Sequence, residues 1–139
     1  MTKINHRTGI LMVANVLILV TQVISNGWSM DSNGYQNISV DRFVEMMEHK
    51  DFVLIDVHIP YAGEIPETDL LIPFNDIKQH KNELPDDKNA KIVVYCLSGP
   101  MGYVAAEKLV SLGYRQVIHF QAGMVSWINT GKQLVNRPN

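Results

Sequence analysis

Residues 93–102, which read VVYCLSGPMG, place the chain's single cysteine, Cys96, between an apolar run and a loop with two glycines. The apolar run over residues 91–95 predicts a buried strand, and the segment from Pro100 to Leu112 predicts a helix. Ligands of open α/β sheets bind at the carboxyl ends of the strands. The sequence therefore predicts a thiol at the sheet edge where functional groups gather.

Around this stretch, helix-like and strand-like patterns alternate along residues 38–135, which we interpret as one domain after a flexible lead-in at residues 31–37. The strand-like segments are continuous apolar runs, which is typical of a parallel sheet covered by helices on both faces. We therefore predict an α/β fold with a parallel sheet flanked by helices on both faces. The expected strands are residues 52–57, 70–72, 91–95 and 116–120, and the expected helices are residues 40–49, 75–84, 100–112 and 123–130.

The composition fits one ordinary globular domain, with 139 residues, 46% of them hydrophobic and 19% charged, and a net charge of −2. A chain of roughly 100–150 residues buries a core without a disulfide or metal framework. One cysteine excludes an intrachain disulfide and a Cys/His zinc cluster, so we expect no metal and no cofactor. The scattered charges form no basic stripe, so nucleic acid is not an expected partner.

Residues 1–30 differ from the rest of the chain, because Lys3 and Arg7 precede an apolar run and no acid occurs before Asp31. The run covers at most the 16 residues 9–24, fewer than the roughly 20 that a transmembrane helix needs. We therefore predict an export signal and a periplasmic or other extracytoplasmic location. The alternatives are an uncleaved membrane anchor and a buried helix of the domain. Membrane contact is expected only through residues 9–24.

Cys96 is the candidate nucleophile of the chain. Two glycines and the short side chain of Ser98 let the loop curl, so that backbone N–H groups point toward the sulfur. The following helix adds its dipole, and both effects favour the thiolate, which is the reactive form of cysteine. The alternative is that Cys96 is a small buried apolar residue, the commonest role of a free cysteine.

Three motifs follow one another along the chain. They are residues 54–57 (LIDV) with 63–66 (GEIP) and 72–73 (IP), then residues 94–102 (VYCLSGPMG), then residues 122–127 (AGMVSW). In this order and spacing they resemble the single-domain rhodanese family. Its members have a strand ending in Asp-Val, a Gly-His-Ile-Pro loop, a Cys-x-x-Gly-x-x loop and a Gly-Gly-x-x-x-Trp helix. The resemblance implies the rhodanese fold for the whole predicted domain.

The resemblance also implies a sulfurtransferase that works through a persulfide on Cys96. The thiolate would take the outer sulfur of a small sulfane-sulfur donor such as thiosulfate and pass it to a thiol or to cyanide. Asp56 and His58 are possible supporting residues, with a turn-forming aspartate and a solvated histidine as the simpler alternatives. Pro100 would contribute no N–H to the loop. The loop residues that would bind the sulfur are Leu97, Ser98, Gly99, Met101 and Gly102.

Four positions depart from the usual family motifs. Met101 stands where many members have arginine, Gly102 where a hydroxyl residue is common, and His58 where arginine often follows Asp-Val. Glu64 replaces the histidine of the Gly-His-Ile-Pro loop. These changes leave the nucleophile in place, but they do not identify the sulfur donor. The missing loop arginine disfavours the phosphatase relatives of the family. The alternative function is a non-catalytic rhodanese module that acts in protein binding or thiol redox sensing.

Overall fold

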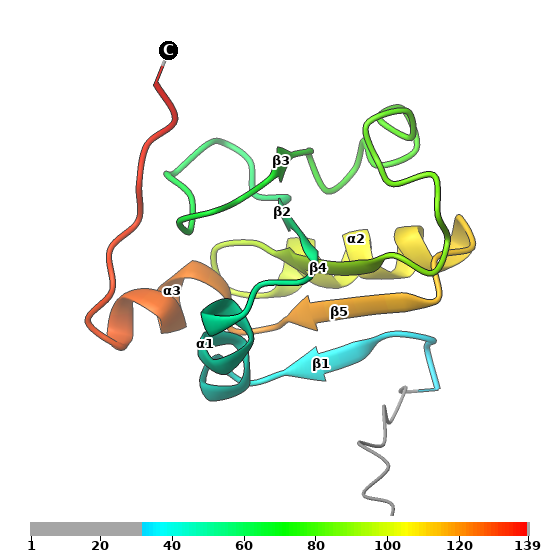
Figure 1. Ribbon diagram of the computed structural model, residues 1–139. Helices are drawn as coiled ribbons and strands as arrows, with labels where there is room; N and C mark the ends of the chain where they lie inside the picture. Colours follow the sequence, from blue (N-terminus) through cyan, green and yellow to red (C-terminus); the bar gives the residue numbers. More distant parts are fainter. Residues whose placement is uncertain (1–31, 139) are drawn as a thin grey trace, which may run out of the picture.

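The computed structural model describes residues 32–138, which contain five strands and three helices. The strands are β1 (Gln36–Ile38), β2 (Val53–Asp56), β3 (Leu70–Leu71), β4 (Lys91–Tyr95) and β5 (Gln116–Phe120); the helices are α1 (Val40–Glu48), α2 (Pro100–Ser111) and α3 (Gly123–Asn129). The strands form one sheet in the order β1-β5-β4-β2-β3 (Figure 1). All pairings are parallel, so the carboxyl ends of the strands meet at one edge.

Helices cover both faces of this sheet. α2 packs on one face, where its buried Ala105, Ala106 and Leu109 share a core with side chains of β2, β4 and β5. α1 and α3 contribute to the core on the other face, where Phe43 stacks on Phe120 with the ring centroids 4.2 Å apart. Figure 1 shows α1 and α2 on opposite sides of the sheet. The predicted α/β fold, with a parallel sheet flanked on both faces, is confirmed.

The strand that leads into Cys96 is the most deeply enclosed. β4 pairs with β2 on one side and β5 on the other, and its last four residues are buried, which explains its continuous apolar run. α2 begins at Pro100, whose fixed φ suits the first turn, and Gly113 follows the helix in a left-handed conformation with φ 91°. Here the predicted strand and helix are confirmed to within one residue.

Residues 75–84 do not form the expected helix. They make a series of turns, in which the N–H of Glu83 donates to the carbonyl of His80 at 2.9 Å, three residues earlier. Ile77 and Leu84 are the buried side chains of this segment. Packing of an apolar stripe is the main source of helix stability in proteins, and two buried side chains provide little of it.

The domain begins earlier than predicted, with the strand β1, which the sequence pattern does not indicate. β1 pairs with β5 along its whole length, and Tyr35 just before it is buried. The expected flexible lead-in over residues 31–37 is therefore wrong for residues 35–37. β1 is a short edge strand that includes the polar residues Gln36 and Asn37, so it lacks the apolar run that marks the other strands.

The predictions of an export signal or membrane anchor in residues 1–30, and of membrane contact through residues 9–24, lie outside the described residues. Within residues 32–138, no helix is both long and apolar enough to cross a membrane. The same part of the chain has no group of three or more His, Cys, Asp or Glu side chains that could hold a metal ion.

Candidate active site

Cys96 directly follows β4 at the carboxyl edge of the sheet, and its side chain is 2% exposed. The backbone N–H of Gly99 donates to its Sγ at 3.0 Å. A donor at this distance stabilises negative charge on the sulfur, and the N-terminus of α2, which begins at Pro100, acts in the same direction. One backbone N–H of the loop therefore faces the sulfur, and the reactivity of Cys96 stays a prediction.

The other predicted loop residues differ in exposure. Gly102 is buried like Gly99, Leu97 and Met101 are half-buried, and Ser98 is exposed. Among these residues, Gly99 donates its N–H to Sγ of Cys96. The roles of the other loop residues in binding a transferred sulfur stay predictions.

The start of α3 holds the outer side of the cysteine loop. The N–H of Met124 donates to the carbonyl of Cys96, and the N–H of Val125 donates to the carbonyl of Leu97, both at 3.0 Å. The approach is close because Gly123 has no side chain: a Cβ there would lie 2.1 Å from the Cys96 carbonyl oxygen. Both carbonyl oxygens are therefore engaged by α3.

His119 is part of this region, although its sequence context suggests an ordinary surface or core histidine. It lies in β5, is buried, and its Nδ1 donates to Oδ1 of Asn37 in β1 at 2.9 Å. Burial lowers the pKa of His119, which favours the neutral ring. A Cβ on Gly102 would lie 2.6 Å from Nε2 of His119, so the imidazole occupies the space beside the first turn of α2. The glycine at position 102 is the feature of the sequence that corresponds to this contact with the ring.

Asp56 ends β2 and is 2% exposed. Its Oδ1 accepts the backbone N–H of His58 at 2.9 Å, which is the contact of a turn-forming aspartate. The next residue joins the neighbouring strand, because the N–H of Val57 donates to the carbonyl of Tyr95 at 2.9 Å. Asp56 therefore lies one strand away from the residue that precedes Cys96.

Burial raises the pKa of Asp56 to about 7; the carboxylate of Glu64 adds to this rise, and the N–H of His58 opposes it. The folded protein thus binds this proton more tightly than the unfolded chain, where the pKa is near 3.8. The contribution to stability is fully present below about pH 4 and is lost as the pH rises from about 4 to about 7.

The Asp56→Asn variant should lose this pH dependence, because it has no proton to release. We expect its free energy of unfolding to rise relative to wild type by up to about 4 kcal/mol between about pH 4 and about pH 8. Urea unfolding of both proteins across this range measures the difference. A difference that is the same at every pH would contradict the assignment.

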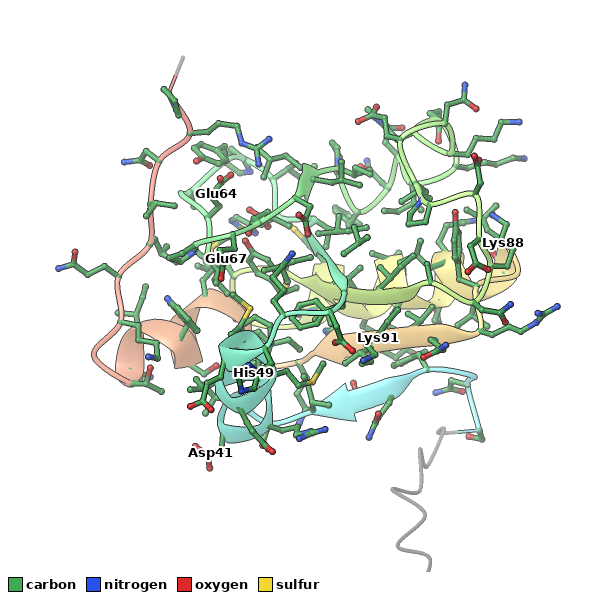
Figure 2. The ribbon with its side chains drawn as sticks, viewed as in Figure 1. Asp41, His49, Glu64, Glu67, Lys88 and Lys91 are labelled. Carbon is green, nitrogen blue, oxygen red and sulfur yellow. The ribbon has the colours of Figure 1, made fainter. Side chains whose placement is uncertain are left out.

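The C-terminal tail packs against the loop that follows β2. Glu64 and Val135 exchange two backbone hydrogen bonds of 2.8 Å, and Nε of Arg137 lies 3.3 Å from Oε2 of Glu64. Figure 2 shows Glu64 at the end of the sheet opposite Lys88. Arg137 thus brings a guanidinium to the carboxyl edge from beyond the predicted end of the domain at residue 135. No motif in the sequence indicates this pairing.

The structure is thus a parallel α/β sheet with a cysteine loop at its carboxyl edge, directly before α2. The chain belongs to the rhodanese-like domain family, whose sequence profile matches residues 39–130. The family suggested by the three motifs is therefore confirmed.

Known relatives support this assignment. A sulfurtransferase of Allochromatium vinosum is 30% identical over 93 residues, which cover 65% of this chain and 84% of that protein. A rhodanese-related protein of Thermoplasma volcanium has a TM-score of 0.62 at 24% identity, covering 74% of this chain and 100% of its own. The human single-domain sulfurtransferase has a TM-score of 0.60 at 20% identity, covering 67% of this chain and 95% of its own. The two structures share the fold with this protein.

Proposed function

We propose that this protein is a sulfurtransferase that carries sulfane sulfur as a persulfide on Cys96. The observation that carries the proposal is the 3.0 Å hydrogen bond from the N–H of Gly99 to Sγ. The carbonyls of Cys96 and Leu97 are held by α3, so they do not compete for this side of the loop. Donors that are already in place stabilise an anionic sulfur both before and after transfer.

The proposed reaction has two displacement steps. The Cys96 thiolate attacks the outer sulfur of the donor, and the donor's S–S bond breaks with its electron pair on the leaving group, which is sulfite when the donor is thiosulfate. A thiol or cyanide then attacks the outer sulfur of the Cys96 persulfide. The acceptor leaves as a persulfide or as thiocyanate, and the Cys96 thiolate is restored.

Incubation with a sulfane donor followed by intact-mass measurement tests the proposal. A persulfide adds one sulfur, on the order of 32 Da, and the chain has one cysteine that can carry it. The Cys96→Ser protein, treated in the same way, is the control and should gain nothing. An unmodified wild-type protein would contradict the proposal.

We propose that persulfides or polysulfides with apolar bodies are better donors than thiosulfate. Thiosulfate brings two negative charges to an anionic nucleophile, and the half-buried Met101 offers it no charge. Arg115 lies at the opposite edge of the sheet, where its guanidinium donates to Asn89 at 3.0 Å. The Arg137 guanidinium is engaged by Glu64.

The Met101→Arg variant should therefore raise kcat/KM for thiosulfate by about tenfold or more, because one charge-assisted contact contributes about 1.5–3 kcal/mol. The matched control is Ser111→Arg, which adds the same charge at the far end of α2. Steady-state assays with thiosulfate and cyanide measure both variants. An equal gain in both, or no gain in either, would contradict a role for position 101.

A non-catalytic docking or redox-sensing module is the second candidate, and the burial of Cys96 is the observation that favours it. In that case the thiol would take up no sulfur from a donor. A redox sensor would also form dimers on a non-reducing gel that disappear in the Cys96→Ser protein.

We also propose that the protein works outside the cytoplasm. The support is the sequence of residues 1–30, in which Lys3 and Arg7 precede an apolar run without acids. Fractionation of a Gram-negative host that expresses either the full chain or a chain starting at Asp31 tests this. The full chain should appear in the periplasm or membrane, and the shortened chain in the cytoplasm.

A further inference from the structure

His119 shares one face of the sheet with Cys96. It lies in β5 and is the register partner of Val94 in β4, so both side chains point to the same face. Val94 and Cys96 pack together in the core under α2, which makes this the α2 face. Because neighbouring strands lie about 4.8 Å apart and rise about 3.3 Å per residue, the Cα atoms of His119 and Cys96 are about 8 Å apart.

The imidazole of His119 fills the space between β5 and the first turn of α2. A Cβ on Gly102 would lie 2.6 Å from Nε2 of His119 and 3.7 Å from the backbone nitrogen of Cys96. Nε2 is therefore the ring atom that faces the point where α2 meets the cysteine loop.

One nitrogen of this ring is hydrogen-bonded and the other is not. Nδ1 donates to Oδ1 of Asn37 at 2.9 Å, so Nε2 of the neutral ring carries the free lone pair. His119 is 3% exposed, and no donor in residues 32–138 contacts Nε2. Buried polar atoms are nearly always paired, so an unpaired acceptor beside the cysteine loop requires an explanation. A proton taken up in one state of the site provides it.

The surroundings of the ring determine when it takes up a proton. Burial and the N-terminus of α2 disfavour a positive ring, whereas the backbone of Gly99 favours it. The titratable and charged groups around the ring are Tyr35 before β1, Tyr103 and Glu107 on α2, and Cys96 after β4. Glu107 is exposed, so water screens its charge. An anion on Cys96 is therefore the change that would most favour protonation of His119.

We propose that His119 is a positioning residue for the transferred sulfur: its ring is neutral beside the Cys96 thiol and takes up a proton when Cys96 carries a persulfide anion. This inference rests on the proposed function and deepens it. The proton comes from solvent and returns to it, and the bonds that form and break are those of the two displacement steps. A positive ring reduces the repulsion between the persulfide and an incoming thiolate, and it stabilises the electron pair that the second step leaves on Sγ.

NMR titration of the His119 ring tests the proposal on the full-length protein. The ring signals are followed against pH before and after loading with polysulfide, and the mass gain is verified. We expect loading to raise the titration midpoint of His119 by about one pH unit or more, the effect of a unit charge about 8 Å away in a protein. His49, exposed at the end of α1, is the control and should not shift.

The two ways in which this titration can fail are distinguishable. An unchanged His119 midpoint in a protein that has gained the mass of one sulfur would overturn the inference. A protein that gains no mass would instead count against the proposed function.

The His119→Gln variant should alter the pH profile of sulfur transfer. Loaded proteins are discharged by 2-mercaptoethanol at several pH values, and each rate is divided by the thiolate concentration. We expect the wild-type rate per thiolate to fall about tenfold as the pH rises through the His119 midpoint, since one pH unit of coupling corresponds to tenfold. The rate of His119→Gln should be low at every pH, and His49→Gln should behave as wild type. The same fall in His119→Gln would overturn the inference.

A fixed carboxylate at position 96 tests the coupling without any loading. Cys96→Asp and Cys96→Asn have side chains of the same shape and differ in charge. The titration midpoint of His119 should be higher in Cys96→Asp by about one pH unit. Equal midpoints in the two variants would overturn the inference even if the wild-type protein carries sulfur.

Discussion

The Cys96→Ser variant should lose sulfur transfer entirely and keep its fold. A hydroxyl is not appreciably ionised at neutral pH, so the nucleophile disappears, while the oxygen can still accept the N–H of Gly99. Cys96→Ala should be equally inactive and less stable by about 1–2 kcal/mol, because it leaves a small void in a well-packed site.

Transfer assays and urea unfolding of both variants measure these effects. The structure adds a reason to prefer serine as the main variant. The position of Cys96 at a strand end suggests a thiol beside solvent, but the residue is buried. Alanine would also leave the N–H of Gly99 without its acceptor. Transferase activity that survives in the serine variant would disprove the role of Cys96.

The Gly123→Ala variant should be strongly destabilised and inactive. The residue has φ 54°, and a Cβ would lie 2.1 Å from the carbonyl oxygen of Cys96 and 2.9 Å from that of Leu97. α3 would have to move away from the cysteine loop and lose the hydrogen bond from Met124 to Cys96. A clash of this severity, added to left-handed strain, should cost about 3–5 kcal/mol.

Gly131→Ala is the matched control for this prediction. Its φ of 82° is also left-handed, but a Cβ there would meet no atom within 4 Å. It should therefore cost about 1 kcal/mol, the strain alone, and leave sulfur loading unchanged. Thermal unfolding and mass measurement of both variants check the contrast. Similar losses in the two variants would mean that the approach to Cys96 is not the cause.

The helices and strands that could be predicted are marked by local features of the sequence. The strand before Cys96 is a continuous apolar run because it is buried between two other strands, and α2 is bounded by Pro100 and Gly113. β1 carries no such signal, because its hydrogen bonds to β5 order a mostly polar segment. Residues 75–84 show the reverse case, a helix-like pattern with too little packing to form a helix.

The residues of the candidate site also differ in whether the sequence predicts them. Cys96 and its glycine loop could be located from adjacent residues, because the strand, the thiol and the helix start follow one another in the chain. The contact of His119 with Asn37 joins residues 82 positions apart, and that of Arg137 with Glu64 joins residues 73 apart. Such pairings depend on the folded arrangement of the chain, and no local pattern in one sequence indicates them.

The close approach of Gly102 and His119 limits the paths by which this loop can evolve. A serine or threonine at position 102 would meet the imidazole, so that substitution should be tolerated only after position 119 has become smaller. The reverse order is open, because a smaller residue at position 119 leaves a void without a clash. Across descendants of this chain, the two positions should therefore covary, with the change at position 119 in β5 preceding the change at position 102 in α2.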